Sequence, residues 1–171
     1  MSLHEAEGRV RVATWNIRGG VGLDGRFDLD RIVAALKRAG PDVVALQEVD
    51  SRRGTSAHQH PFILLRQALG AHSVEAKSII SSHGEYGQIL ISRWPFAEIK
   101  IHDLSVSGRE PRRAIEADVL SPHGPLRVVA THLGLRFGER RRQTDALVEM
   151  AQRAPHTTVM MGDFNDWIWR G

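Results

Sequence analysis

The residues of this sequence that can do chemistry stand where apolar runs end. Val159, Met160 and Met161 form such a run, and Asp163 and Asn165 follow it. On an extended backbone, residues two positions apart face the same side, so a carboxylate and an amide are predicted to project together from the end of a buried strand. The stretch is also good turn and helix-capping chemistry, and taken alone it leaves that alternative open.

A second apolar run ends at the carboxylate of Glu48. Glu48 is in phase with Val44 and Leu46, which predicts that it continues a buried face. Burying an ionised carboxylate is costly without a partner, and a metal ion is one such partner. Solvation at the strand end, or an ion pair with Arg52 or Arg53, is the alternative interpretation.

Two further runs end at Asn16 and His132. Asn16 stands just before Gly19 and Gly20, and His132 follows the run Val128–Ala130. Each has a plainer explanation, because asparagine is a common turn residue and a histidine at such a position can be structural. If the strands are neighbours, however, the four ends converge on one cleft. Carboxylate, amide and imidazole groups there could hold a hard cation, move a proton or stabilise a phosphate oxygen.

The composition is that of one globular domain over residues 1–171, with 42% hydrophobic and 25% charged residues. The net charge is only +3, and almost all of the positive charge is arginine, whose planar fork suits phosphate oxygens. The absence of cysteine excludes disulfides and thiolate zinc sites. No apolar stretch approaches the length of a membrane span, so we expect a cytoplasmic protein.

Hydrophobic periodicity predicts two strand–helix pairs, followed by a run of closely spaced strands that is typical of antiparallel sheet. A final helix then precedes the strand at Val159–Met161. The predicted strands are Arg9–Ile17, Val43–Leu46, Ser73–Ile80, Gly87–Ser92, Ala97–Leu104, Ala114–Leu120 and Leu126–His132. The predicted helices begin near Asp28, Phe62 and Gly138 and end before Gly40, Gly70 and Pro155.

Five short motifs, in this order, resemble the endonuclease/exonuclease/phosphatase superfamily, which includes deoxyribonuclease I. The resemblance implies an α/β (α+β) fold, a four-layer αββα sandwich of two mostly antiparallel sheets flanked by helices. The motifs are Thr14-Trp15-Asn16-Ile17, Leu46-Gln47-Glu48-Val49, Tyr86-Gly87-Gln88-Ile89-Leu90-Ile91-Ser92-Arg93, Thr131-His132-Leu133 and Gly162-Asp163-Phe164-Asn165.

The resemblance also implies roles for these residues. Glu48 is similar to the principal ligand of Mg²⁺ or Mn²⁺, with Asn16 close to the metal and phosphate. Asp163 resembles the carboxylate that orients or deprotonates the attacking water. Asn165 and His132 resemble catalytic residues that contact the phosphoryl oxygens. The residues implied to bind substrate are Asn16, Tyr86 and Arg113.

Arg113 belongs to a cluster with Arg109 and Arg112 just before a predicted strand. From the pattern alone, these arginines either contact phosphate or pair with Glu110 and Glu116. Both interpretations remain open at this point.

Members of the family continue beyond the Gly-Asp-x-Asn strand to a late aspartate and a Ser-Asp-His motif. This sequence ends at Gly171, and His156 does not match that motif. We therefore expect a truncated chain whose last strands are missing. That would leave a sheet edge open and the stretch Trp167–Trp169 uncovered, which favours self-association.

The function implied is a metal-dependent phosphohydrolase that cleaves a phosphodiester or phosphomonoester by attack of water. It is implied for a parent protein, and only weakly for these residues alone. The expected partner is a phosphate ester, either a small molecule, a lipid headgroup or nucleic acid, and no obligate protein partner is evident. A DNA-repair endonuclease or exonuclease is one alternative, and a non-catalytic binding domain that retains the fold is the other.

Overall fold

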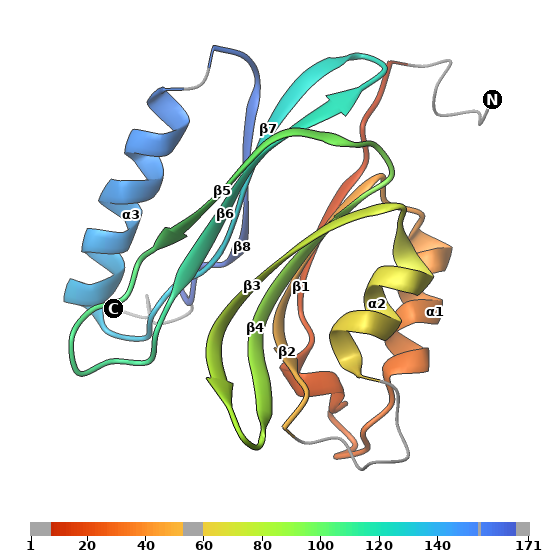
Figure 1. Ribbon diagram of the computed structural model, residues 1–171, viewed down its shortest axis with the longest axis vertical. Helices are drawn as coiled ribbons and strands as arrows, with labels where there is room; N and C mark the ends of the chain where they lie inside the picture. The colour runs from red at the N-terminus through yellow and green to blue at the C-terminus, as the bar shows by residue number, and fades with distance from the viewer. Residues whose placement is uncertain (1–7, 53–59, 154, 167–171) are drawn as a thin grey trace.

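The computed structural model describes residues 8–52, 60–153 and 155–166. Two four-stranded sheets stand face to face, with helices α1 and α2 outside one sheet and α3 outside the other (Figure 1). This arrangement gives four layers in the order helix, sheet, sheet, helix. The predicted αββα sandwich is confirmed.

Each sheet contains one parallel and two antiparallel strand pairs, so the sheets are mostly antiparallel, as predicted. The first sheet has the order β1 (Val12–Asn16), β2 (Val43–Asp50), β4 (Gly84–Ser92), β3 (His72–Ser81). The second has the order β5 (Phe96–Asp103), β6 (Arg113–Ser121), β7 (Gly124–His132), β8 (Thr158–Asp163). The helices are η1 (Arg18–Gly20), α1 (Leu29–Ala39), α2 (Pro61–Leu69) and α3 (Phe137–Gln152).

The strand directions bring the termini that carry the site residues to one end of the sandwich. β1 and β2 run parallel, as do β7 and β8, while β4 and β6 run antiparallel to their neighbours. The ends of β1, β2, β7 and β8 therefore lie together with the beginnings of β4 and β6, at the lower end of Figure 1. The predicted convergence of strand ends is confirmed.

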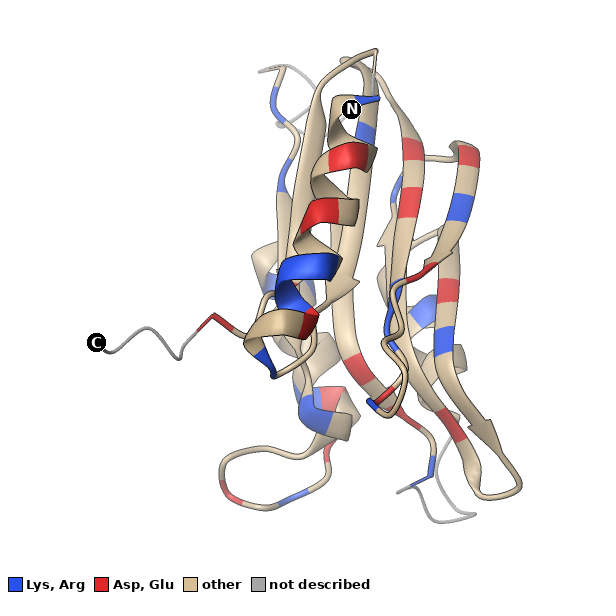
Figure 2. Cartoon of the chain, turned by 90° about the vertical axis from the view of Figure 1, so that its left-hand side faces the viewer, with Lys and Arg blue, Asp and Glu red and all other residues tan. Residues whose placement is uncertain are grey.

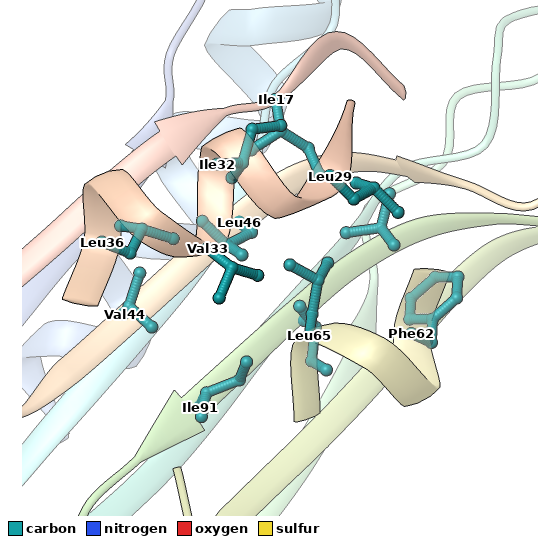
Figure 3. Packing of buried hydrophobic residues seen from close by; sticks show 12 residues of the cluster. Ile17, Leu29, Ile32, Val33, Leu36, Val44, Leu46, Phe62, Leu65 and Ile91 are labelled. Carbon is teal, nitrogen blue, oxygen red and sulfur yellow. The ribbon is translucent and has the colours of Figure 1, made fainter. Parts of the chain in front are cut away.

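Alternating side chains of β2 build two different cores. Val44 and Leu46 pack toward α1 and α2, where they contact Leu65 and other buried apolar side chains (Figure 3). Val43 and Ala45 point the other way, into the core between the two sheets. The strand is buried on both faces, as its continuous apolar run predicts. A third core joins the second sheet to α3.

The helix boundaries follow from their caps. The side chain of Asp28 accepts a hydrogen bond from the backbone N–H of Arg31 at 2.9 Å and so begins α1. Gly40 ends this helix in the left-handed region, with φ at 60°. Pro61 occupies the first turn of α2, where its missing N–H costs no hydrogen bond.

Each sheet has two edge strands among the described residues, β1 and β3 in the first sheet and β5 and β8 in the second. β1 is hydrogen-bonded only to β2, and β8 only to β7. The side chain of Trp15 on β1 is partly exposed to solvent. An open sheet of four strands has such edges in any case, so the prediction that the last strands are missing stays a prediction. The stretch Trp167–Trp169 lies outside the described residues. No described helix has the length and apolar character needed to cross a membrane.

The packing of α2 can be tested with two substitutions in the same helix. Leu65 is fully buried in the core of Figure 3, whereas Ile63 is 37% exposed. We expect Leu65→Ala to lower the free energy of unfolding by about 2–5 kcal/mol, because it leaves a cavity. Ile63→Ala, the control, should cost less than about 1 kcal/mol. Urea denaturation followed by circular dichroism measures both, and equal losses would contradict the packing described.

Candidate active site

Four predicted site residues meet at the lower end of the sandwich. Nδ2 of Asn16 donates hydrogen bonds to Oε1 of Glu48 at 2.7 Å and to Oδ2 of Asp163 at 2.8 Å. Nε2 of His132 lies 3.8 Å from Oδ2 of Asp163 and 4.0 Å from Oε1 of Glu48. These side chains come from β1, β2, β7 and β8, so both sheets contribute to one cluster.

Glu48 reaches this cluster through a β-bulge, and the phase argument made from the sequence was wrong. Strict alternation would place Glu48 with Val44 and Leu46, facing α1 and α2. The pairing of β2 with β4 instead shifts by one residue between Leu46 and Val49, and Glu48 has φ at 56°. The extra residue turns Glu48 toward the second sheet, while Val49 remains in the core beside the helices.

Asp163 and Asn165 share the site through a turn, and not through the strand alternation that we predicted. β8 ends at Asp163, and Asn165 has φ at 51°. Oδ1 of Asp163 accepts the backbone N–H of Asn165 at 2.9 Å, which is the hydrogen bond of an Asx turn. Nδ2 of Asn165 donates to the carbonyl of Leu133 at 2.7 Å, so the turn is tied to the end of β7.

The glycine before Asp163 permits this close approach of β8 to β7. Gly162 has φ at 148°, and a Cβ there would collide with the carbonyl oxygen of Thr131. Because Asp163 is the strand partner of His132, this close pairing holds the carboxylate beside the imidazole.

His132 is buried and neutral at physiological pH. Burial is the main cause that lowers its pKa from 6.5 to about 4, and the neighbouring Arg112 guanidinium adds to that effect. Asp163 and Glu48 act in the opposite direction but do not outweigh it. A neutral imidazole can donate one hydrogen bond and accept another. Nδ1 of His132 lies 3.5 Å from Nη1 of Arg112, so this nitrogen can be the acceptor.

A cavity of about 290 Å³ opens beside the cluster, and we call it the central cavity. Its walls include Glu48, His132, Asn165, Tyr86, Arg18 and Arg112. Burial and the charges of Glu48 and Glu110 raise the pKa of Tyr86 to about 12, so its hydroxyl stays a hydrogen-bond donor. The predicted placement of Tyr86 at the site thus agrees with the structure, although its role stays a prediction.

The structure does not bring the side chain of Arg113 into this cluster. Arg113 begins β6, and its guanidinium pairs with Asp103 of the neighbouring strand at 2.8 Å. Arg112 lines the central cavity instead and is only 7% exposed. Nη1 of Arg112 pairs with Glu110, whereas its buried Nε has no hydrogen-bond partner among the described residues. A buried donor without an acceptor is suited to a ligand oxygen.

Arg18 is a second cavity residue that the sequence prediction missed. Three non-glycine residues have positive φ in the described part of the chain, and they are Arg18 (52°), Glu48 (56°) and Asn165 (51°). All three line the central cavity. Such conformations are costly and cluster at functional sites. Nothing in the sequence marks Arg18 as a cavity residue. Arg112 does have a distinctive position, because it stands between Pro111 and a strand.

The donor set suits a divalent cation. Glu48 and Asp163 are hydrogen-bonded to the same amide group, yet neither pairs with a lysine or arginine among the residues described. Two neighbouring carboxylates without a compensating cation are unfavourable unless a metal ion is bound, and hard oxygen ligands fit Mg²⁺ or Mn²⁺. No described cluster holds three acidic or histidine side chains at ligand spacing. Water and substrate would therefore complete the coordination, as is usual for Mg²⁺.

Fold and site together define a DNase I-like sandwich with an acidic cluster at the strand ends. The chain belongs to the endonuclease/exonuclease/phosphatase family, whose model matches residues 13–171.

Comparison with known proteins adds three relatives. The uncharacterized protein YbhP of Escherichia coli (strain K12) is 28% identical over 174 residues, covering 92% of this chain and 67% of YbhP. An endonuclease/exonuclease/phosphatase from Beutenbergia cavernae DSM 12333 superposes with a TM-score of 0.69 at 25% identity, over 91% of this chain and 47% of that one. D. rerio TDP2, solved with a single-strand DNA product, gives a TM-score of 0.65 at 22% identity, over 91% and 60%. The chain thus spans about half to two thirds of these relatives.

The low pKa of His132 predicts a pH-dependent stability. Above pH 6.5 the imidazole is neutral in both folded and unfolded protein, so it imposes no cost. Between pH 6.5 and about 4 the unfolded state binds a proton that the folded state does not, and stability falls as the pH falls. We expect a loss of up to about 3 kcal/mol over this range in metal-free protein. Urea denaturation at several pH values should show that His132→Asn lacks this part of the slope; an identical slope would contradict the assignment.

Proposed function

We propose that this chain carries the centre of a divalent-metal-dependent phosphoester hydrolase that uses Mg²⁺ or Mn²⁺. The observation that carries the proposal is the pair of carboxylates, Glu48 and Asp163, which share the Asn16 amide without a cationic partner among the described residues. Family membership supports hydrolysis of a phosphoester bond as the general reaction.

The residues of the carboxylate pair and those around it have different proposed roles. Glu48, with Asn16, would hold the metal, which supplies Lewis-acid activation of a phosphoryl oxygen when bound. Asp163 lies beside His132 and would orient the attacking water, and neutral His132 would hydrogen-bond a phosphoryl oxygen. Asn165, fixed by its bond to Leu133, is proposed to contact the phosphoryl group as negative charge develops.

Arg112 is the cationic residue best placed to bind the ester. It lies against His132, and its buried Nε has no described partner, so a phosphate oxygen would supply the missing acceptor. Tyr86, a protonated phenol on the cavity wall, is a second donor. The amide of Asn16 is hydrogen-bonded to both carboxylates. Its main proposed role is therefore to position Glu48 and Asp163, and a contact to substrate is secondary.

A small phosphate ester suits the site better than duplex DNA. The central cavity, at about 290 Å³, has the volume for a phosphoryl group and one modest substituent. Figure 2 shows acidic and basic residues interspersed along α3 and the adjacent strands. Along these elements, acidic residues interrupt the continuous basic track that nucleic acid favours (Figure 2). A DNA-repair nuclease is the second candidate, because TDP2 shares the fold and was solved with a DNA product.

Metal-dependent hydrolysis is tested with aryl phosphodiesters and phosphomonoesters. We expect turnover that requires Mg²⁺ or Mn²⁺ and falls by about 100-fold or more in Glu48→Gln and in Asp163→Asn, because each removes a charge that the reaction needs. Circular dichroism shows whether each variant is folded.

Metal binding without turnover by any of these esters would favour a non-catalytic domain instead. Salt-dependent cleavage of single-stranded DNA, with no turnover of small esters, would favour the nuclease.

Two adjacent arginines provide a matched test of substrate binding. We expect Arg112→Lys to lower kcat/KM about tenfold, because lysine keeps the charge but loses the fork that contacts two oxygens. Arg113→Lys should change kcat/KM by less than about twofold, since that guanidinium pairs with Asp103. Steady-state kinetics on one aryl ester measures kcat/KM for both variants. The opposite ranking would support the assignment of Arg113 made from the sequence.

Two further expectations stay predictions. These are a cytoplasmic location and self-association through an open sheet edge. Gel filtration over a range of concentrations measures the second directly.

A further inference from the structure

A second cavity, of about 650 Å³, lies at the open edge of β1, between that strand, α1 and the loop before α1. We call it the apolar cavity. Its apolar lining includes Trp15 and Ile17 of the first strand region, Leu23 of the loop, and Ile32 and Ala35 of α1. Trp15 is 41% exposed there, so an indole face is available to a ligand.

The apolar cavity adjoins the central cavity at Arg18. Arg18 lines both of them, and Asn16, whose amide holds Glu48 and Asp163, also lines the apolar cavity. A group that leaves the phosphate site past Asn16 therefore meets an apolar surface.

The loop that bears Leu23 is held in place by its own contacts. Arg31 pairs with Asp24 at 2.9 Å, and Val21 forms a β-bridge with Phe27. Gly22 packs so closely on Arg31 that a Cβ there would collide with the guanidinium. Leu23 is nevertheless 95% exposed. A leucine fixed by such a loop at the mouth of a cavity is positioned to contact a bound apolar group.

Arg18 stands at the junction of the two cavities in a strained conformation. Its backbone N–H donates to Oδ1 of Asn16 at 3.0 Å, and its φ is 52°. Its side chain is exposed, and no described carboxylate pairs with it. Arg31, by contrast, is occupied by Asp24. Arg18 thus offers a guanidinium to an anion located between the central and apolar cavities.

We propose that the apolar cavity binds the apolar substituent of the phosphate ester, with Arg18 holding the phosphate at the junction. The ligand class is a phosphate ester or phosphonate that carries an aryl ring or an alkyl chain. This proposal rests on the proposed function, because it takes the central cavity as the phosphate site. It deepens that function by specifying what the ester carries.

Binding of non-hydrolysable phosphonates tests the cavity without turnover. Isothermal titration with methylphosphonate, phenylphosphonate and hexylphosphonate, in the presence of Mg²⁺, compares the three substituents. We expect the phenyl or the hexyl compound to bind about tenfold more tightly than methylphosphonate, because it buries apolar surface. Preference for one of the two distinguishes a planar subsite from an acyl-chain subsite. Equal affinity for all three would overturn the proposal.

Two substitutions test whether the preference for the larger phosphonate arises in the apolar cavity. Leu23→Ser removes an exposed apolar contact, and Ala35→Phe fills part of the cavity from α1. Each should reduce the preference for the larger phosphonate to less than about threefold. Leu120→Ser, which changes a 48% exposed leucine at the far end of β6, is the matched control and should keep the preference. A preference that survives in both cavity variants would overturn the proposal.

Hydrolysis assays distinguish a failure of this inference from a failure of the proposed function. If no phenyl or hexyl phosphate ester is hydrolysed but the phosphonate preference follows Leu23 and Ala35, the apolar cavity stands as a binding site and the hydrolytic function fails. If the esters are hydrolysed with equal kcat/KM whatever their substituent, and the phosphonates bind equally, the hydrolytic function stands and the apolar cavity is not the subsite.

Discussion

The shared hydrogen bonding of two carboxylates to one amide is the interaction on which the site depends. Asn16 contributes both N–H groups, one to Glu48 and one to Asp163. Like charges this close repel, and the amide offsets only part of that repulsion. Because Asn16 and Glu48 belong to the first sheet and Asp163 to the second, the same contact also sets how the sheet ends meet. The fold therefore places two carboxylates side by side at the strand ends, and a divalent cation would neutralise their charge.

The resemblance to the family predicted the layers, and local sequence patterns predicted the strands whose ends converge. Long apolar runs such as Val43–Leu46 and Val128–Ala130 are buried on both faces, and each ends where a polar side chain appears. Caps such as Asp28 and Gly40 marked the helix boundaries, because their chemistry is local. These features depend on neighbours in the chain, so they can be read without knowledge of tertiary contacts.

The direction of individual site residues could not be predicted in the same way. Alternation places a side chain only while the strand is regular, and the bulge at Glu48 breaks that regularity without any mark in the side-chain pattern. Arg112 lies one residue before β6, where no strand partner fixes its direction, whereas Arg113 lies inside the strand and pairs across it with Asp103. The choice between adjacent arginines is made by tertiary contacts, which a single sequence does not display.

The strained backbone at Glu48 has a physical explanation in the packing of β2. A positive φ at a non-glycine residue costs about 1–3 kcal/mol and persists only where surrounding structure enforces it. Leu46 before the bulge and Val49 after it are both fully buried in the core beneath α1 and α2. In a regular strand, a Leu46 that faces the helices would place Glu48 on the same side and turn Val49 away from that core. The bulge lets the strand keep both apolar anchors while it presents a carboxylate to Asn16 and His132.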